Sequence, residues 1–164
     1  RIPFLKALLI AYVWSALVVF LPTSAHVDDP DVFGDRWRAM CLWLPWFLAI
    51  AIAFDIRDLA HDPPTFRTVP QVFGRKGAKF FALLFLLPML TYLALLVLLT
   101  YRPIEPGWRE PGVDLALALP CVGVIMTAVL IIRATPERPW WYYSILLDGM
   151  LIVLPLLYLL GGLA

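Results

Sequence analysis

Five long apolar runs constrain the fold of this chain more than any other feature. Each consists almost wholly of aliphatic and aromatic residues, and polar segments that carry proline or glycine separate them. A helix needs about 20 mostly apolar residues to cross roughly 30 Å of hydrocarbon. We therefore expect an all-α integral membrane protein whose single domain, residues 1–164, contains about five transmembrane helices. The expected spans are residues 2–21, 39–54, 80–100, 115–132 and 140–164.

The composition excludes a water-soluble protein. Hydrophobic residues make up 62% of the chain and charged residues 15%, whereas a soluble domain has about 45 to 50% apolar and about 25% charged residues. A soluble fold could not cover so much apolar surface. The formal net charge is +1 and the sequence contains no long basic run, so nothing in the charge pattern indicates nucleic-acid binding.

Basic residues gather at alternate ends of the expected spans. One side of the membrane would collect most of the chain's 13 Lys and Arg residues, and the other would carry Arg36, Arg38, Arg102 and Arg109. Cytoplasmic loops are the ones enriched in Lys and Arg, so we expect a multi-pass protein of a bacterial inner membrane with residues 55–79 as a cytoplasmic loop. The basic residues on the expected cytoplasmic side are Arg1, Lys6, Arg57, Arg67, Arg75, Lys76, Lys79, Arg133 and Arg138.

Three aspartates follow the second apolar run at a helical spacing. Asp55, Asp58 and Asp62 stand at positions i, i+3 and i+7, which fall within an arc of about 60° on one helix face. Carboxylates on one face repel each other unless a cation lies between them, and oxygen ligands suit a hard ion such as Mg²⁺. The motif therefore predicts a magnesium site for a diphosphate at the mouth of a membrane cavity. The alternative is a solvated helix end whose aspartates pair with nearby arginines.

The same segment resembles a known family. The stretch Asp-Ile-Arg-Asp-Leu-Ala-His-Asp at 55–62, the Thr-Val-Pro at 68–70 and the Phe-Gly-Arg-Lys-Gly-Ala at 73–78 together resemble the second aspartate-rich motif of the UbiA superfamily of intramembrane aromatic prenyltransferases. The opening Ile-Pro-Phe-Leu-Lys at 2–6, with Trp14, resembles the segment that begins the fifth helix of that family. The resemblance covers nearly all of this chain.

The resemblance implies that the expected helices form the second half of a nine-helix bundle around a lipid-open cavity. The first aspartate motif and the first four helices of the family would then lie in a missing N-terminal half or in a partner chain. The chain begins at Arg1 rather than methionine, which we interpret as the start of an internal segment. Because the family holds its metal and diphosphate between both motifs, we expect no turnover by this chain alone.

As a function, the resemblance implies Mg²⁺-dependent transfer of an isoprenyl group from an allylic diphosphate to an aromatic or other lipophilic acceptor. The metal and basic side chains would stabilise the charge that grows on the leaving diphosphate. An apolar cavity would protect the allylic cation from water. The expected partners are therefore an isoprenyl diphosphate, the lipophilic acceptor and membrane lipid.

The resemblance and the positions of individual residues together identify candidate site residues. Asp148 lies inside the last apolar run, where a carboxylate is costly unless it faces a cavity or a partner, so we expect it either to orient the acceptor or to bond a neighbouring helix. His61 falls off the face of the aspartates and is expected at the surface. The candidate metal ligands are Asp55, Asp58 and Asp62, the catalytic candidates are Asp58, Asp62 and Asp148, and the diphosphate-binding candidates are Lys6, Arg57, Arg75 and Lys76.

Other functions share parts of this pattern. Phosphatidyl-group transferases also hold a metal with spaced aspartates on membrane helices, but here the pair Asp148-Gly149 follows the triple motif and lacks the Ala-Arg pair of their signature. Soluble polyprenyl synthases have amphipathic helices, which the composition excludes. A non-catalytic membrane subunit, or an ion-handling or transport protein with a degenerate aspartate motif, stays open as an alternative.

Overall fold

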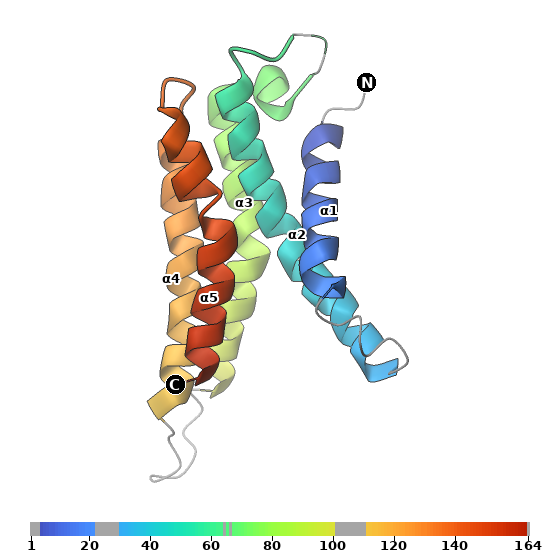
Figure 1. Ribbon diagram of the computed structural model, residues 1–164, viewed down its shortest axis with the longest axis vertical. Helices are drawn as coiled ribbons and strands as arrows, with labels where there is room; N and C mark the ends of the chain where they lie inside the picture. Colours follow the sequence, from blue (N-terminus) through green and yellow to red (C-terminus); the bar gives the residue numbers. More distant parts are fainter. Residues whose placement is uncertain (1–3, 22–29, 64, 66, 101–110, 164) are drawn as a thin grey trace.

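The computed structural model describes residues 4–21, 30–63, 65, 67–100 and 111–163, and these are almost entirely helical (Figure 1). No strand occurs in this part of the chain, so the all-α prediction is confirmed. Residues 2 and 3 of the first expected span and residue 164 of the last lie outside the described residues. The elements are α1 Leu5–Phe20, α2 Pro30–Asp58, α3 Val69–Thr100, α4 Pro111–Arg133, the π-helix η3 Tyr142–Leu147 and α5 Met150–Leu163.

The helices extend beyond the apolar runs that predicted them. Helix α2 runs to Asp58 and α3 begins at Val69, so residues 55–79 are mostly helical and their assignment as a loop is corrected. Backbone hydrogen bonds continue a helix through polar residues until a breaker is reached. Here the Pro-Pro pair at 63 and 64 removes backbone donors and disfavours a helical conformation before it.

The helices pack in the order of the chain. Helix α1 lies against α2, α2 against α3, α3 against α4, and α4 against α5 (Figure 1). Successive helices are antiparallel, so the beginning of α1, the end of α2, the beginning of α3 and the end of α4 lie together (Figure 1). This shared end carries the aspartate motif and the loop between α4 and η3.

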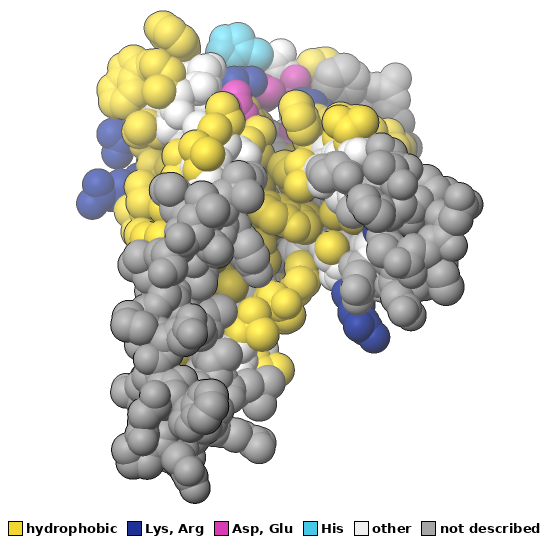
Figure 2. All heavy atoms as spheres, turned by 60° about the horizontal axis from the view of Figure 1, so that its bottom comes forward, with side chains coloured by type: hydrophobic (Ala, Val, Ile, Leu, Met, Phe, Trp, Pro, Cys, Tyr) yellow, Lys and Arg dark blue, Asp and Glu magenta, His cyan; other side chains and the backbone are white. Residues whose placement is uncertain are grey.

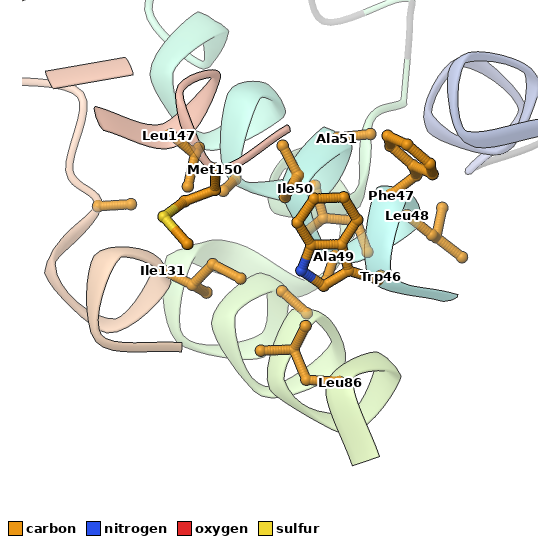
Figure 3. Close-up of a cluster of buried hydrophobic side chains, with 14 of the residues drawn as sticks. Trp46, Phe47, Leu48, Ala49, Ile50, Ala51, Leu86, Ile131, Leu147 and Met150 are labelled. Atoms are coloured by element: carbon orange, nitrogen blue, oxygen red, sulfur yellow. The ribbon is translucent and has the colours of Figure 1, made fainter. Parts of the chain in front are cut away.

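The core lies where α2, α3, α4 and the last two helical segments meet. The side chains of Ile131 and Met150 point toward one another, and the fully buried Trp46 points into the same interior (Figure 3). Helices α4 and α5 approach closely at Gly123, where a Cβ atom would lie 2.6 Å from Cδ1 of Leu154. Small residues at such contacts let apolar helices gain close packing, which is the main force between helices in lipid.

Two helical stretches are long and apolar enough to cross a membrane. They are Arg36–Asp58, with 23 residues, and Val69–Leu98, with 30 residues. Shorter apolar helices occupy Leu5–Phe20, Leu119–Arg133 and Tyr142–Leu154. Many large apolar side chains stay exposed on the outer faces of the helices (Figure 2). Apolar surface of this extent is unfavourable in water and is typical of a membrane or an interaction surface.

Candidate functional site

Three carboxylates converge on one ammonium group at the end of α2. The Nζ atom of Lys6 lies 3.0 Å from Oδ2 of Asp62, 3.3 Å from Oδ1 of Asp55 and 3.6 Å from Oδ2 of Asp58. We call these four residues the aspartate–lysine cluster. The structure therefore brings together the three aspartates that their spacing placed on one helix face, and it adds a cation between them.

The end of α2 keeps Asp62 on the same face as the two earlier aspartates. Asp55 and Asp58 belong to the last turn of α2. Beyond it the backbone N–H groups of His61 and Asp62 both donate to the carbonyl oxygen of Asp58, at 2.8 Å each. The side chain of Gln71 then donates from Nε2 to the carbonyl oxygen of Asp62 at 3.2 Å. The chain thus continues the helical path for one more turn, which α3 holds in place.

Aromatic packing places Lys6 above the end of α2. Helix α1 begins directly after Phe4, whose φ of 72° lies in the left-handed region. The ring of Phe4 packs against Phe73 and Phe81 of α3, at centroid distances of 5.9 and 5.8 Å. These contacts anchor the beginning of α1 beside α3. Lys6, in the first turn of α1, therefore reaches the carboxylates of α2.

The cluster is buried at one side and open at the other. The side chain of Asp55 is 3% exposed, whereas Asp62 is 16%, Asp58 25% and Lys6 42% exposed. A buried carboxylate is costly unless a cation or several donors satisfy it. Lys6 neutralises the buried Asp55, and the carboxylates of Asp58 and Asp62 remain partly exposed at the surface.

Arg57 is held between two aromatic rings and one carboxylate. Its Nε donates to Oδ1 of Asp58 at 2.7 Å. Its Cζ lies 4.8 Å from the ring centroid of Phe54 and 5.7 Å from that of Tyr143. A planar guanidinium stacks well on such rings. Because it carries five N–H donors, the same side chain can serve Asp58 and a second anion.

A cavity of about 300 Å³ opens beside this cluster, between α1, α2 and the beginning of α5. Charged side chains form one end of it, and aliphatic and aromatic side chains form the rest of its walls. Such a shape suits a ligand that has a charged head and an apolar body. The lining residues are Lys6, Ile10, Trp14, Phe47, Ile50, Ala51, Phe54, Asp55, Arg57, Asp58, Asp148 and Leu151.

Asp148 reaches this cavity from the break between η3 and α5. Its backbone N–H donates to the carbonyl oxygen of Tyr143 at 2.9 Å, which encloses one residue more than an α-helical bond. The next backbone N–H, of Gly149, donates to the oxygen of Ile145 at 3.1 Å. A Cβ atom at Gly149 would lie 2.1 Å from that oxygen, so the break requires glycine. The extra residue turns Asp148 by about 100° relative to a regular helix.

Two of the expected diphosphate-binding residues do not line the cavity. Nη1 of Arg75 lies 3.1 Å from Oε1 of Glu137, in the loop between α4 and η3, and Lys76 is exposed on α3. The backbone of Gly74 departs from helical geometry inside α3, with φ of 71° and ψ of 172°. Arg75 and Lys76 follow directly after this break. Lys6 and Arg57, by contrast, both line the cavity.

Sequence reasoning missed the apolar wall of the site. Ile10 and Trp14 follow Lys6 at successive intervals of four residues, so helical spacing alone places them on one face of α1. Tyr92 lines a separate open groove on α3. His61 is exposed, as expected.

The donor chemistry of the cluster fits Mg²⁺, but an ammonium group lies at its centre. Three carboxylates supply only oxygen ligands, which a hard divalent cation prefers. In the described part of the chain, no group of three or more His, Cys, Asp or Glu side chains is arranged so that it could hold a metal ion. Lys6 would therefore have to leave its place between Asp55 and Asp62 before a metal could bind. The magnesium site stays a prediction.

Comparison with models of known protein families, with curated proteins and with solved structures found no match. The resemblance of residues 55–78 to the UbiA superfamily therefore stays a prediction.

Proposed function

We propose that this chain is the membrane-embedded part of a UbiA-like prenyltransferase, which moves an isoprenyl group from an allylic diphosphate to an aromatic or other lipophilic acceptor. The observation that carries the proposal is the convergence of Asp55, Asp58 and Asp62 at the mouth of a cavity with apolar walls. The charged end of the cavity suits a diphosphate, and the apolar walls suit an isoprenyl chain and its acceptor.

The proposal places all five helical regions across the membrane, with the aspartate–lysine cluster on the cytoplasmic side. The antiparallel order of the helices and their exposed apolar faces support it. Helix α1 has 16 residues, a length of about 24 Å at 1.5 Å per residue. A helix slightly shorter than the hydrocarbon layer is accommodated by local thinning and by long basic side chains at its end, and Lys6 occupies that position in α1.

In this proposal each residue of the cluster has a separate role. Asp55, Asp58 and Asp62 would hold Mg²⁺, which when bound neutralises negative charge on a diphosphate and so weakens the allylic carbon–oxygen bond. Lys6, once turned away from the aspartates, and Arg57 would donate hydrogen bonds to phosphate oxygens. The donors lie on α1 and α2, which pack against each other, so a diphosphate would be held between the two helices.

The apolar walls and Asp148 would govern the remaining chemistry. The diphosphate leaves with the bonding electron pair, the acceptor forms a bond to the allylic carbon, and the acceptor then loses a proton. Trp14 and Phe47 on the cavity wall exclude water that would otherwise capture the allylic cation. Asp148 faces the cavity with Arg57 at its charged end, where its carboxylate would orient a polar group of the acceptor.

The test measures Mg²⁺-dependent release of pyrophosphate from geranyl and farnesyl diphosphate with an acceptor present. The protein is produced from its complete natural reading frame, because the proposal assigns a first aspartate motif to a missing half or a partner chain. Asp58→Asn and Asp62→Asn should each abolish release. Asp35→Asn, at the opposite end of α2, is the matched control and should keep it. Equal release by all three variants would refute the proposed site.

A second candidate function rests on the position of Lys6. An ammonium group that neutralises three carboxylates is also what a purely structural ion-pair cluster contains, as in a non-catalytic membrane subunit or an ion-handling protein. This alternative predicts that Lys6→Arg preserves all properties of the protein and that no allylic diphosphate binds. Binding of farnesyl diphosphate that depends on Asp58 would exclude it.

A further inference from the structure

A second charged cluster lies at the same end of the molecule, on the other side of α3. Arg75 and Lys79 come from the first part of α3, Arg133 ends α4, and Arg138 lies in the loop before η3. We call these four residues the basic cluster. Arg75 and Arg138 both lie close enough to Lys79 to repel its charge. The cluster is absent from the lining of the cavity described above.

Neutral backbone oxygens and one carboxylate hold three of these side chains, those of Lys79, Arg138 and Arg75. Nζ of Lys79 donates to the carbonyl oxygen of Ile132 at 2.7 Å, and Nε of Arg138 donates to that of Arg133 at 3.3 Å. Basic side chains are favourable beside the carbonyl groups that end a helix. These contacts fix the position of the cations but leave their charge uncompensated, because carbonyl oxygens carry no full charge.

Among the described residues, Glu137 is the acid that lies within this cluster. Its Oε1 is 3.1 Å from Nη1 of Arg75. Its own backbone N–H and the Thr135 hydroxyl bond the carboxylate, and with Arg75 beside it they hold the pKa of Glu137 below its ordinary value. The carboxylate is thus ionised at neutral pH, yet the basic cluster contains four cations and this one acid. Water screens part of this excess charge, because the side chain of Arg75 is 50% exposed, but the cluster still attracts a further anion.

Exposed aromatic side chains border the basic cluster. Trp140 is 71% exposed, Phe80 63% and Trp141 46%. The Cζ atom of Arg138 lies 5.4 Å from the ring centroid of Tyr142. Tryptophan and tyrosine concentrate at the level of lipid headgroups, so these residues set the basic cluster at that depth if the helices cross a membrane.

We propose that the basic cluster binds the phosphate group of an anionic phospholipid, with the bordering aromatic side chains against its glycerol and upper acyl region. Basic pockets between helices on the cytoplasmic side are suited to such headgroups, and the forked guanidinium of arginine matches two phosphate oxygens. The inference rests on the membrane placement proposed above and is independent of prenyl transfer. A soluble phosphate offers the same oxygens, so the experiment has to separate the two sources.

The test measures binding of phosphatidylglycerol to the purified full chain in detergent micelles, by native mass spectrometry and by the shift in thermal unfolding on lipid addition. Phosphatidylcholine is the neutral reference. Arg133→Gln with Arg138→Gln should weaken phosphatidylglycerol binding about 30-fold, since each basic residue near the headgroups contributes about fivefold. Glu137→Gln should strengthen it, because the competing carboxylate is removed.

Two further double variants distinguish lipid binding at a specific site from attraction by the overall positive charge of this end of the molecule. Arg67→Gln with Lys76→Gln removes the same charge from the same end of the molecule but outside the basic cluster, and should leave binding unchanged. Arg133→Lys with Arg138→Lys keeps the charge and should retain most of the binding even where the Gln variant folds poorly. Equal losses in the two Gln variants would overturn the proposal. Displacement of the lipid by millimolar inorganic phosphate would overturn the assignment to a lipid.

Discussion

Replacing Lys6 by methionine isolates the contribution of a single cation to the fold. Methionine keeps the unbranched shape of the side chain and removes its charge. The substitution leaves the carboxylates of Asp55, Asp58 and Asp62 facing each other, where Nζ of Lys6 now lies within 3.6 Å of all three. Because the side chain of Asp55 is 3% exposed, that carboxylate has little water with which to replace the lost ammonium. The variant should therefore be less stable than the wild type.

The expected loss in the free energy of unfolding follows from how deeply the charged partners are buried. Breaking a fully buried ion pair costs about 3 to 5 kcal/mol, whereas an exposed pair contributes about 0 to 1 kcal/mol. Lys6 is 42% exposed, so water screens it, and Arg57 still holds Asp58 at 2.7 Å. A loss of about 2 kcal/mol lies between these limits. For a chain of this size it lowers Tm by about 4 to 8 °C.

Thermal unfolding followed by circular dichroism in detergent micelles at low salt measures this loss. Lys79→Met is the matched control, because its ammonium contacts the neutral carbonyl oxygen of Ile132 and its removal relieves repulsion within the basic cluster. Asp55→Asn in the Lys6→Met background should restore part of the lost stability, since residues in one charged network are not additive. An unchanged Tm for Lys6→Met, or effects of Lys6 and Asp55 that simply add, would refute the electrostatic account of the cluster.

Three further results are expected from other parts of the chain. Gly149→Ala should lower the free energy of unfolding by more than about 2 kcal/mol, because its Cβ would lie 2.1 Å from the carbonyl oxygen of Ile145. Thermal unfolding measures the loss, and a wild-type Tm would show that the π-helical turn can relax. Tyr143→Phe should cost about 1 kcal/mol, since Oη donates to the oxygen of Thr135 at 2.9 Å, and a neutral result would show that this bond does not contribute. The carboxyl of Glu137 should titrate in a carbon-13 NMR titration with a pKa below its ordinary 4.5. Its favourable interactions with Arg75 and the Thr135 hydroxyl are therefore complete above pH 4.5 and are lost as the pH falls through the lowered pKa. A midpoint at or above 4.5 would contradict the contacts seen here.

Apolar content and spacing predicted the helical fold but not the limits of its helices. The apolar runs indicate where a helix must be, because only hydrogen-bonded backbone is tolerated in an apolar environment. They do not indicate where it ends, since backbone hydrogen bonds carry α2 through Asp55 and Asp58 and start α3 at Val69. The π-helix at Tyr142–Leu147 was not predicted either, because the residues there continue the apolar run without a distinct pattern.

The candidate site was predictable where it depends on one helix and unpredictable where it depends on several. The spacing of Asp55 and Asp58 within α2 placed them on one face without knowledge of the fold. The position of Lys6 between them depends on the packing of Phe4 against α3, which no local pattern encodes. Proximity in sequence was misleading for Arg75, because its guanidinium pairs with Glu137 in the loop between α4 and η3.

The packing of each helix against its neighbour in the chain has a consequence for folding. Contacts between sequence neighbours close short loops and form quickly, so the α1–α2 pair can assemble without the later helices. Lys6 would then neutralise the aspartates once α3 packs against Phe4, before α4 and α5 arrive. Asp148 and Leu151 complete the cavity wall only when the last helix docks. Pulsed hydrogen exchange during refolding should therefore protect α1 and α2 ahead of α5. The carboxylates gain their counter-ion early, and the binding cavity is the last part of the molecule to form.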